Sequence, residues 1–351
     1  MSKKKTIALI LAAVIVLGFI IGGIIRNNDI KDASDPAATE DVSAPKRLIN
    51  PLTGEKLDKD ISSARPYCIM INNHAVARPS VGLSHASIIY EALVEGDITR
   101  LMAIFSDVEG FDIGHIRSCR PCYSDLALAY DGIYVHWGAS SYTYNYLEQC
   151  GIDNIDQLKL GDAPGFFRES GSTAMEHRAM INGTKLSEYA KAHNRIEHED
   201  GYDTSYGLSF AENAVNQCEK ESANFTVQYI NSTKTEFIYN EDKQCYNAYM
   251  SGTEYKDRTD STFIDIANVL ILNVPYKIVD NVGKPLKDMD LTASGTGYLA
   301  TGGKYVEINW SRNDLADNFH YTLTDGTPLN LSVGRTYICI APLDMGGSVT
   351  W

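Results

Sequence analysis

The chain has 351 residues and a formal net charge of −14, from 45 acidic and 31 basic side chains. This acidic balance argues against nucleic acid as a partner. A hydrophobic content of 44% and a charged content of 22% are ordinary for globular protein.

The chain begins with an apolar segment. Residues 6–25 carry no charge, and Lys3, Lys4 and Lys5 precede them. Twenty helical residues, at about 1.5 Å each, span roughly the 30 Å hydrocarbon core of a bilayer. A cleavable signal peptide has a shorter apolar region, of about 7–15 residues. We therefore predict a transmembrane signal anchor within residues 1–26, with a cytoplasmic N-terminus and the bulk of the chain outside the cell membrane.

Residues 27–46 are rich in Asp, Ala, Pro and Ser, with too few large apolar groups to offset the entropy lost on ordering. They are predicted to form a disordered acidic tether. The 305 residues from 47 to 351 are enough for one large domain or two of ordinary size.

The first half alternates between strand and helix patterns. Short apolar runs predict strands at Tyr67–Ile71, Arg100–Phe105 and Gly132–Trp137. Apolar residues at helical spacing predict a helix over Leu83–Val94, and Pro121 favours the start of another. This alternation predicts an α/β domain over residues 47–210.

The second half reads as strands and turns. Runs rich in Val, Ile, Tyr and Thr predict strands at Phe225–Ile230, Thr235–Tyr239, Val269–Asn273, Lys304–Asn309 and Thr336–Ile340. Turns are predicted at Gly295–Gly297, Thr301–Gly303 and Thr324–Gly326. We place a boundary near residues 200–222. A smaller β-rich C-terminal domain over 222–351, with helix limited to a turn or two, should follow it.

Arginine and lysine are segregated in the first half. No lysine occurs between Lys59 and Lys159, yet this stretch holds Arg65, Arg78, Arg100, Arg117 and Arg120. The two residue types serve equally well as surface charge, but only arginine offers a planar fork for carboxylate or phosphate. One interpretation is a pocket for an anionic group such as a glycan phosphate, a uronic acid or a peptide carboxylate. The alternative is internal pairing of the arginines with Glu91, Glu95, Asp97 or Asp125.

Two further patterns could carry chemistry. Glu91 and Glu95 stand four residues apart, so on a helix they share a face. A carboxylate pair can serve acid–base hydrolysis of a glycoside, provided that the surroundings of the two groups separate their pKa values. Cys119-Arg-Pro-Cys122 precedes a predicted helix, where a thiol beside arginines should have a depressed pKa, as in thiol–disulfide oxidoreductases. For the two glutamates, the alternative is a pair of ordinary surface acids. For the two cysteines, the alternative is a structural disulfide or two unreactive thiols. No HExxH pair occurs and the seven cysteines are scattered, so we expect neither metal nor cofactor.

The central residues resemble the YerB-like family of bacterial envelope proteins, which have a domain of unknown function and a separate C-terminal part. The resemblance rests on Met70–Asn73, Arg78-Pro79, Gly82-Leu83, Tyr90-Glu91, Glu95-Gly96, Thr99-Arg100, Gly114–Ser118 and Arg120-Pro121. It implies an envelope location and a two-part layout, and it brings no established enzymatic activity with it. Family members often carry a lipid-attachment cysteine, whereas no cysteine precedes Cys68 here. The family pattern tolerates other residues at Cys119 and Cys122, which weakens the redox hypothesis.

The leading hypothesis is a membrane-anchored extracytoplasmic module that binds or scaffolds an anionic cell-wall component or a membrane protein partner. Arg100, Arg117 and Arg120 would contact the anion, Asn72 and Asn73 would orient the ligand, and Glu91 and Glu95 would hold the arginines in place. The competing hypotheses are a cell-envelope hydrolase that uses the Glu pair and a redox protein that uses Cys119 and Cys122.

Overall fold

The computed structural model describes residues 48–281 and 283–351. The predicted membrane anchor and acidic tether lie outside these residues. Within the described ranges, no helix has both the length and the apolar character needed to span a bilayer.

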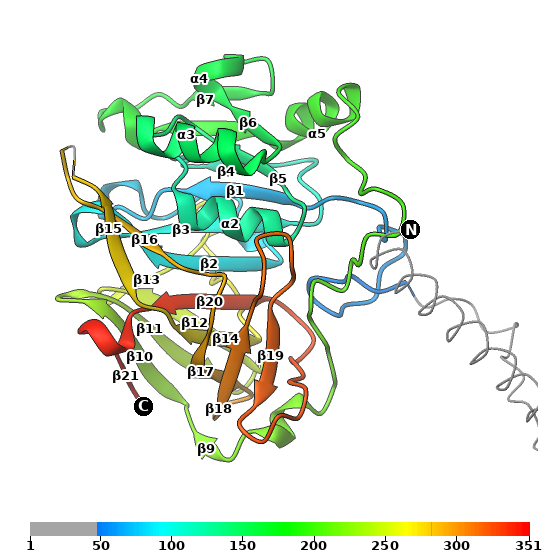
Figure 1. Cartoon of the computed structure of the whole chain (residues 1–351), viewed down its shortest axis with the longest axis vertical. Helices are drawn as coiled ribbons and strands as arrows, with labels where there is room; N and C mark the ends of the chain where they lie inside the picture. Colours follow the sequence, from blue (N-terminus) through cyan, green and yellow to red (C-terminus); the bar gives the residue numbers. More distant parts are fainter. Residues whose placement is uncertain (1–47, 282) are drawn as a thin grey trace, which may run out of the picture. The chain divides into compact units, whose positions relative to one another are not determined.

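A mixed sheet of eleven strands runs through both halves of the chain (Figure 1). The first half contributes β1 (Tyr67–Ile71), β2 (Ile88–Leu93), β3 (Thr99–Phe105), β5 (Ile133–His136) and β6 (Asn154–Asp156). The second half contributes β9 (Lys220–Glu221), β14 (Asn268–Asn273), β17 (Ser294–Thr301), β18 (Lys304–Ser311), β19 (His320–Leu323) and β20 (Thr336–Ala341). The two sets meet where β2 pairs in parallel with β20, and every residue of both strands is buried. The described residues of both halves form one compact unit.

The smaller sheets belong to one half or the other. The second half has a five-stranded sheet of β10 (Asn224–Ile230), β11 (Thr233–Asn240), β12 (Cys245–Met250), β13 (Thr253–Glu254) and β21 (Ser348–Thr350), and the hairpin of β15 (Tyr276–Asp280) and β16 (Leu286–Met289). The first half has a sheet of β4 (Asp112–Gly114), β7 (Phe166–Arg168) and β8 (Ala179–Asn182).

All four described α-helices lie in the first half (Figure 1): α2 (Pro121–Ala129), α3 (Ser141–Cys150), α4 (Gln157–Leu160) and α5 (Gly183–Ala192). After residue 192, the described helical segments are two 3₁₀ turns, η5 (Ala214–Gln217) and η6 (Leu343–Met345). The predicted α/β character of the first half and β-rich character of the second are thus confirmed. All eight predicted strands occur, and α2 begins at Pro121 as expected.

The helix predicted over Leu83–Val94 is wrong. One 3₁₀ turn, η2 (Leu83–His85), precedes strand β2. The apolar run of β2 is buried on both faces, and such a run matches helical spacing by chance. The turn predicted at Gly295–Gly297 is also wrong, because both glycines lie within β17. A Cβ on Gly297 would lie 2.3 Å from the Ile271 carbonyl oxygen of β14, so glycine serves close strand approach there.

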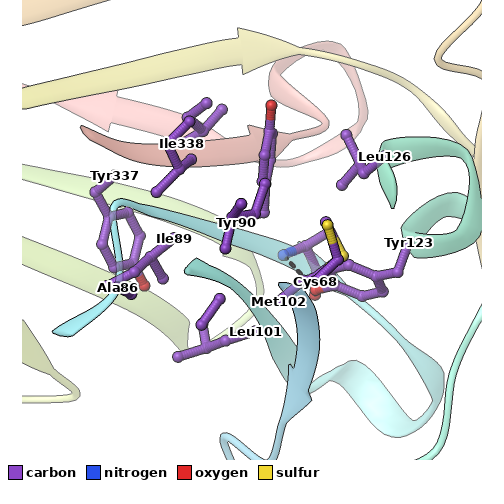
Figure 2. Close-up of a cluster of buried hydrophobic side chains, with 14 of the residues drawn as sticks. Cys68, Ala86, Ile89, Tyr90, Leu101, Met102, Tyr123, Leu126, Tyr337 and Ile338 are labelled. Carbon is purple, nitrogen blue, oxygen red and sulfur yellow. Dashed lines mark hydrogen bonds between the residues drawn. The ribbon is translucent and has the colours of Figure 1, made fainter. Parts of the chain in front are cut away.

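The main core joins side chains from both halves (Figure 2). Tyr123 and Leu126 of α2 belong to the same buried cluster as Tyr90 of β2, and Ile338 of β20 also belongs to it. The buried hydroxyls have partners: Tyr90 Oη lies 2.8 Å from Tyr130 Oη, and Tyr123 Oη accepts from the Ala92 N–H at 2.9 Å. Because β1, β2 and β20 all contribute to this shared core, their relative positions are set by its packing.

Candidate functional site

A buried carboxylate, Glu91 of β2, lies where the two halves meet. Its side chain is 1% exposed and accepts four hydrogen bonds. Oε1 accepts from Thr99 Oγ1 at 2.6 Å and Asn73 Nδ2 at 3.2 Å. Oε2 accepts from Thr235 Oγ1 and Tyr337 Oη, both at 2.7 Å. Four donors fill the lone-pair sites of an ionised carboxylate, so hydrogen bonds from both halves stabilise its charge.

Neither glutamate is free for acid–base chemistry. Glu91 lies in a strand and Glu95 in the 3₁₀ turn η3 (Glu95–Asp97), so the shared helical face predicted for them does not exist. Glu91 contacts none of the arginines, which corrects its predicted supporting role. Glu95 pairs with Arg120 through both carboxylate oxygens and lies 4.0 Å from Arg100 Nη2. Both carboxylates are fully engaged, an arrangement that gives the hydrolase hypothesis no support.

Arg100 and Arg120 are committed inside the protein. They are 5% and 8% exposed. Arg100 Nη1 donates to the Ser118 carbonyl oxygen, and Arg120 Nη1 to that of Cys119, each at 2.6 Å. Burial lowers the pKa of Arg120 to about 10. With Glu95 as their shared partner, Arg100 and Arg120 are paired inside the protein, as the alternative to an anion pocket predicted.

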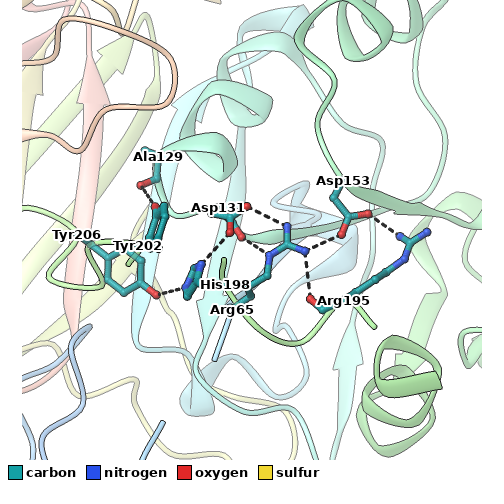
Figure 3. Close-up of polar contacts among 8 residues, drawn as sticks. All are labelled: Arg65, Ala129, Asp131, Asp153, Arg195, His198, Tyr202 and Tyr206. Carbon is teal, nitrogen blue, oxygen red and sulfur yellow. Dashed lines mark hydrogen bonds and ion pairs between the residues drawn. The ribbon is translucent and has the colours of Figure 1, made fainter. Parts of the chain in front are cut away.

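Arg65 is likewise a structural residue (Figure 3). Its guanidinium lies 2.9 Å from Asp153 Oδ2 and 3.2 Å from Asp131 Oδ1. Arg195 and His198 approach the same two carboxylates, each at 2.8 Å. The network fastens the segment before β1 to the end of the first half.

Arg117 differs from the other predicted arginines. Hydrogen bonds from its backbone N–H to the Met70 carbonyl oxygen and from the Trp137 N–H to its own carbonyl place it between the ends of β1 and β5. Its half-buried guanidinium makes no hydrogen bond or ion pair with any residue that the structure describes. Burial, and then the positive charge of Arg100, lower its pKa. The side chain is therefore a cation without a direct partner among the described residues, although the exposed carboxylate of Glu176 is near enough to oppose the lowering of its pKa.

Other basic groups gather beside Arg117. Arg168 of β7 stacks over Trp137, with its Cζ 4.2 Å from the ring centroid. Asn72 Nδ2 lies 2.9 Å from His177 Nδ1, and the rings of His177 and His74 are 5.0 Å apart. Burial, and then the charge of Arg117, lower the pKa of His177. We call Arg117, Arg168, His74 and His177 the basic cluster; Asn72, predicted to orient a ligand, orients His177 in it.

Two adjoining cavities extend the site past His74. A cavity of about 190 Å³ is lined by His74, Asn73, Arg78 and Glu91, together with hairpin residues 232–234 of the second half. A larger cavity of about 640 Å³ shares Arg78 with it and continues along residues 250–258. Both cavities therefore lie between the two halves of the chain.

The surroundings of Cys119 and Cys122 do not favour the thiolate form that the redox hypothesis requires. Cys119 and Cys122 are both fully buried free thiols. Burial raises the pKa of each thiol, whereas the hypothesis requires a depressed value. The helix N-terminus and the arginines were expected to lower the thiol pKa values, but desolvation of the buried thiols raises them by more.

Some of these residues escaped the sequence analysis. Thr235 and Tyr337 reach Glu91 from 144 and 246 residues away, and no local pattern marks them. Arg168 and His177 lie outside the stretch without lysine. Arg78 lay within that stretch, and its segregation from lysine was a usable signal.

Comparison with known proteins places the chain in a family. Residues 52–197 match the family described as "Protein of unknown function (DUF3048) N-terminal domain", and residues 225–338 match the corresponding C-terminal domain. The chain is 30% identical over 300 residues to "Putative lipoprotein YerB" of Bacillus subtilis (strain 168), which covers 85% of this chain and 87% of that protein. The crystal structure of YerB from Bacillus subtilis superposes with a TM-score of 0.74 at 29% identity, covering 87% of this chain and all of the other. The chain thus belongs to the DUF3048 family, with both of its domains, and is a relative of YerB.

Proposed function

We propose that this protein is a membrane-anchored extracytoplasmic module that binds an anionic envelope component through the basic cluster. The observation that carries the proposal is the Arg117 guanidinium, which has no hydrogen-bond or ion-pair partner in the described part of the chain and lies beside further cations. The predicted anchor and the name of the relative YerB support a place at the outer face of the cell membrane.

The cluster has the chemistry of an anion site. Arg117 and Arg168 repel one another, the exposed Glu176 carboxylate offsets part of this repulsion, and a bound anion would offset the rest. Arg117 offers a planar fork suited to carboxylate or phosphate. Since Asn72 Nδ2 donates to His177 Nδ1, the neutral His177 ring carries its proton on Nε2 and can donate from there.

The basic cluster is positively charged, whereas the protein as a whole is negatively charged. With a net charge of −14, general attraction of anions to the surface is weak. Anion binding would therefore depend on the local arrangement of Arg117, Arg168 and His177. This makes single-residue variants informative.

Replacement of Arg117 by glutamine should weaken anion binding at least tenfold. A charge-assisted hydrogen bond contributes about 1.5–3 kcal/mol, and about 1.4 kcal/mol corresponds to a tenfold change in affinity. Isothermal titration calorimetry of the full-length protein with glucuronate and with inorganic phosphate measures the change, and glucose serves as the uncharged ligand.

The matched control is Lys185→Gln, which removes one exposed positive charge from α5. It should leave the affinity for both anions within about twofold of wild type, since salt screens the charge of an exposed lysine. Equal affinities for wild type and Arg117→Gln, or equal losses in both variants, would contradict the proposal.

A further inference from the structure

A second arginine, Arg78, is free to bind an anion close to the basic cluster. It is half-buried and follows the 3₁₀ turn η1 (Ala75–Ala77). Its Nη1 donates to the Met250 carbonyl oxygen at 3.2 Å, and no carboxylate among the described residues forms an ion pair with it. Its Nη2 bonds to no residue that the structure describes and, unlike Nε, is not buried. Because Arg78 lines both cavities between the halves, its guanidinium offers a donor and a positive charge to a ligand there.

His74 connects the basic cluster with Arg78. The His74 ring lies 5.0 Å from that of His177, and His74 lines the smaller cavity together with Arg78. One 3₁₀ turn separates His74 from Arg78 in the chain, and four residues at about 2 Å each span roughly 8 Å. The charges that shift the pKa of Arg117 do not include that of Arg78. The two guanidinium groups therefore lie too far apart to share one small anion.

Acidic groups leave the route between them open. From His74 to Arg78 the chain has only the apolar residues of η1, of which Ala75 and Val76 are exposed. Glu91 also lines the smaller cavity, but its side chain is 1% exposed and its four acceptor sites are filled from within the protein. Internal hydrogen bonds thus stabilise its charge, and it presents almost no surface to a ligand. An anionic chain can therefore pass from the basic cluster to Arg78 along the outside of η1.

We propose that the basic cluster and Arg78 together bind a linear polyanion, a glycan or polyol chain that carries one carboxylate or phosphate on each repeat. One anion of the chain lies at Arg117, and a later one lies at Arg78. Both kinds of anion match the planar fork of a guanidinium. The inference rests on the proposed anion site at Arg117 and deepens it, because it names the class of ligand.

A nucleic acid is also a linear polyanion, but the site lacks the surface that its bases need. Proteins that bind single strands stack the bases on aromatic side chains. Among the described residues that line the smaller cavity there is no Phe, Tyr or Trp. A polymer without bases therefore fits this surface better.

Chain length provides the test, because linking anions on one chain makes the second contact intramolecular. Calorimetric titrations of the full-length protein compare galacturonate with its linear hexamer, and glycerol 3-phosphate with the linear hexamer of glycerol phosphate. In at least one pair, the hexamer should bind at least tenfold more tightly per repeat than the monomer. A gain in one pair only identifies the anion as carboxylate or as phosphate. The fully methyl-esterified galacturonate hexamer keeps the chain without its charges and should not bind.

Two variants locate the second contact. Arg78→Gln should bind each hexamer no more tightly per repeat than the corresponding monomer, because the contact with the second anion is lost. Ala75→Glu leaves Arg78 in place and adds a negative charge on the exposed surface between His74 and Arg78, so it should remove the same gain. The exposed control Lys185→Gln should keep the full gain with chain length.

Equal affinity per repeat for monomer and hexamer in both pairs would overturn the polyanion proposal, and so would a full gain in both Arg78→Gln and Ala75→Glu. Tighter binding of hexathymidylate than of either hexamer would identify a nucleic-acid ligand and overturn it as well. The anion site at Arg117 is tested by the monomers alone. If Arg117→Gln binds them as tightly as wild type does, the proposed function fails, whatever the effect of chain length.

Discussion

Glu91→Gln is expected to lower the free energy of unfolding by about 2–4 kcal/mol, since an amide cannot accept from all four donors around this position. The NH₂ group of the glutamine would point either at the donors of Thr99 and Asn73 or at those of Thr235 and Tyr337, so two of the four hydrogen bonds would be lost. Burial, and then the Glu91 carboxylate, raise the pKa of Tyr337 far above its usual value, so its hydroxyl stays a donor. Urea denaturation followed by circular dichroism measures the loss.

Glu307→Gln is the matched control for that substitution. Glu307 pairs with Lys220 at 2.7 Å on the surface, where both side chains are more than half exposed. Exposed pairs contribute roughly 0–1 kcal/mol, so this variant should unfold near the wild-type urea concentration. A Glu91→Gln variant as stable as Glu307→Gln would show that the buried network contributes little.

Asp125→Asn should make the protein more stable at pH 8 by roughly 1–3 kcal/mol, and should change its stability little at pH 4. Burial raises the pKa of Asp125 to about 7, while a hydrogen bond from Tyr146 opposes the rise and the charge of Asp288 adds to it. Burial also raises the pKa of Asp288 to about 6. These carboxyl groups are thus held in surroundings that favour the protonated form.

The sign follows from proton binding. Between about pH 4 and pH 7 the folded protein holds a proton on Asp125 that the unfolded chain releases, so stability falls as pH rises. The stabilising contribution is complete below about pH 4 and is lost as pH passes about 7. Urea midpoints for wild type, Asp125→Asn and the exposed control Asp242→Asn at pH 4 and pH 8 measure it. The same decline in Asp125→Asn as in wild type would contradict the assignment.

The sequence was most informative where the pattern was local. Short runs of β-branched and aromatic residues marked the strands, and Pro121 marked the start of α2. The segment Leu83–Val94 was misread because β2 is buried on both faces and lacks the alternation of a half-exposed strand. The parallel pairing of β2 with β20 joins segments almost 250 residues apart, and periodicity contains no information about such pairing.

The candidate site was predicted in part. Segregation of arginine from lysine pointed to the region that holds Arg117 and Arg78, but could not separate them from Arg100 and Arg120. That distinction depends on where Glu95 lies, since one carboxylate serves both buried arginines. No carboxylate among the described residues forms an ion pair with Arg117, and the exposed Glu176 acts on it only through longer-range attraction.

The most direct test of anion binding at the basic cluster is a crystal structure of residues 47–351 soaked with glucuronate or phosphate. We predict an ordered anion with an oxygen about 2.7–3.2 Å from a guanidinium nitrogen of Arg117, with His177 beside it. An ordered anion bound elsewhere, with the Arg117 guanidinium still unpartnered at a ligand concentration that saturates binding in solution, would contradict it.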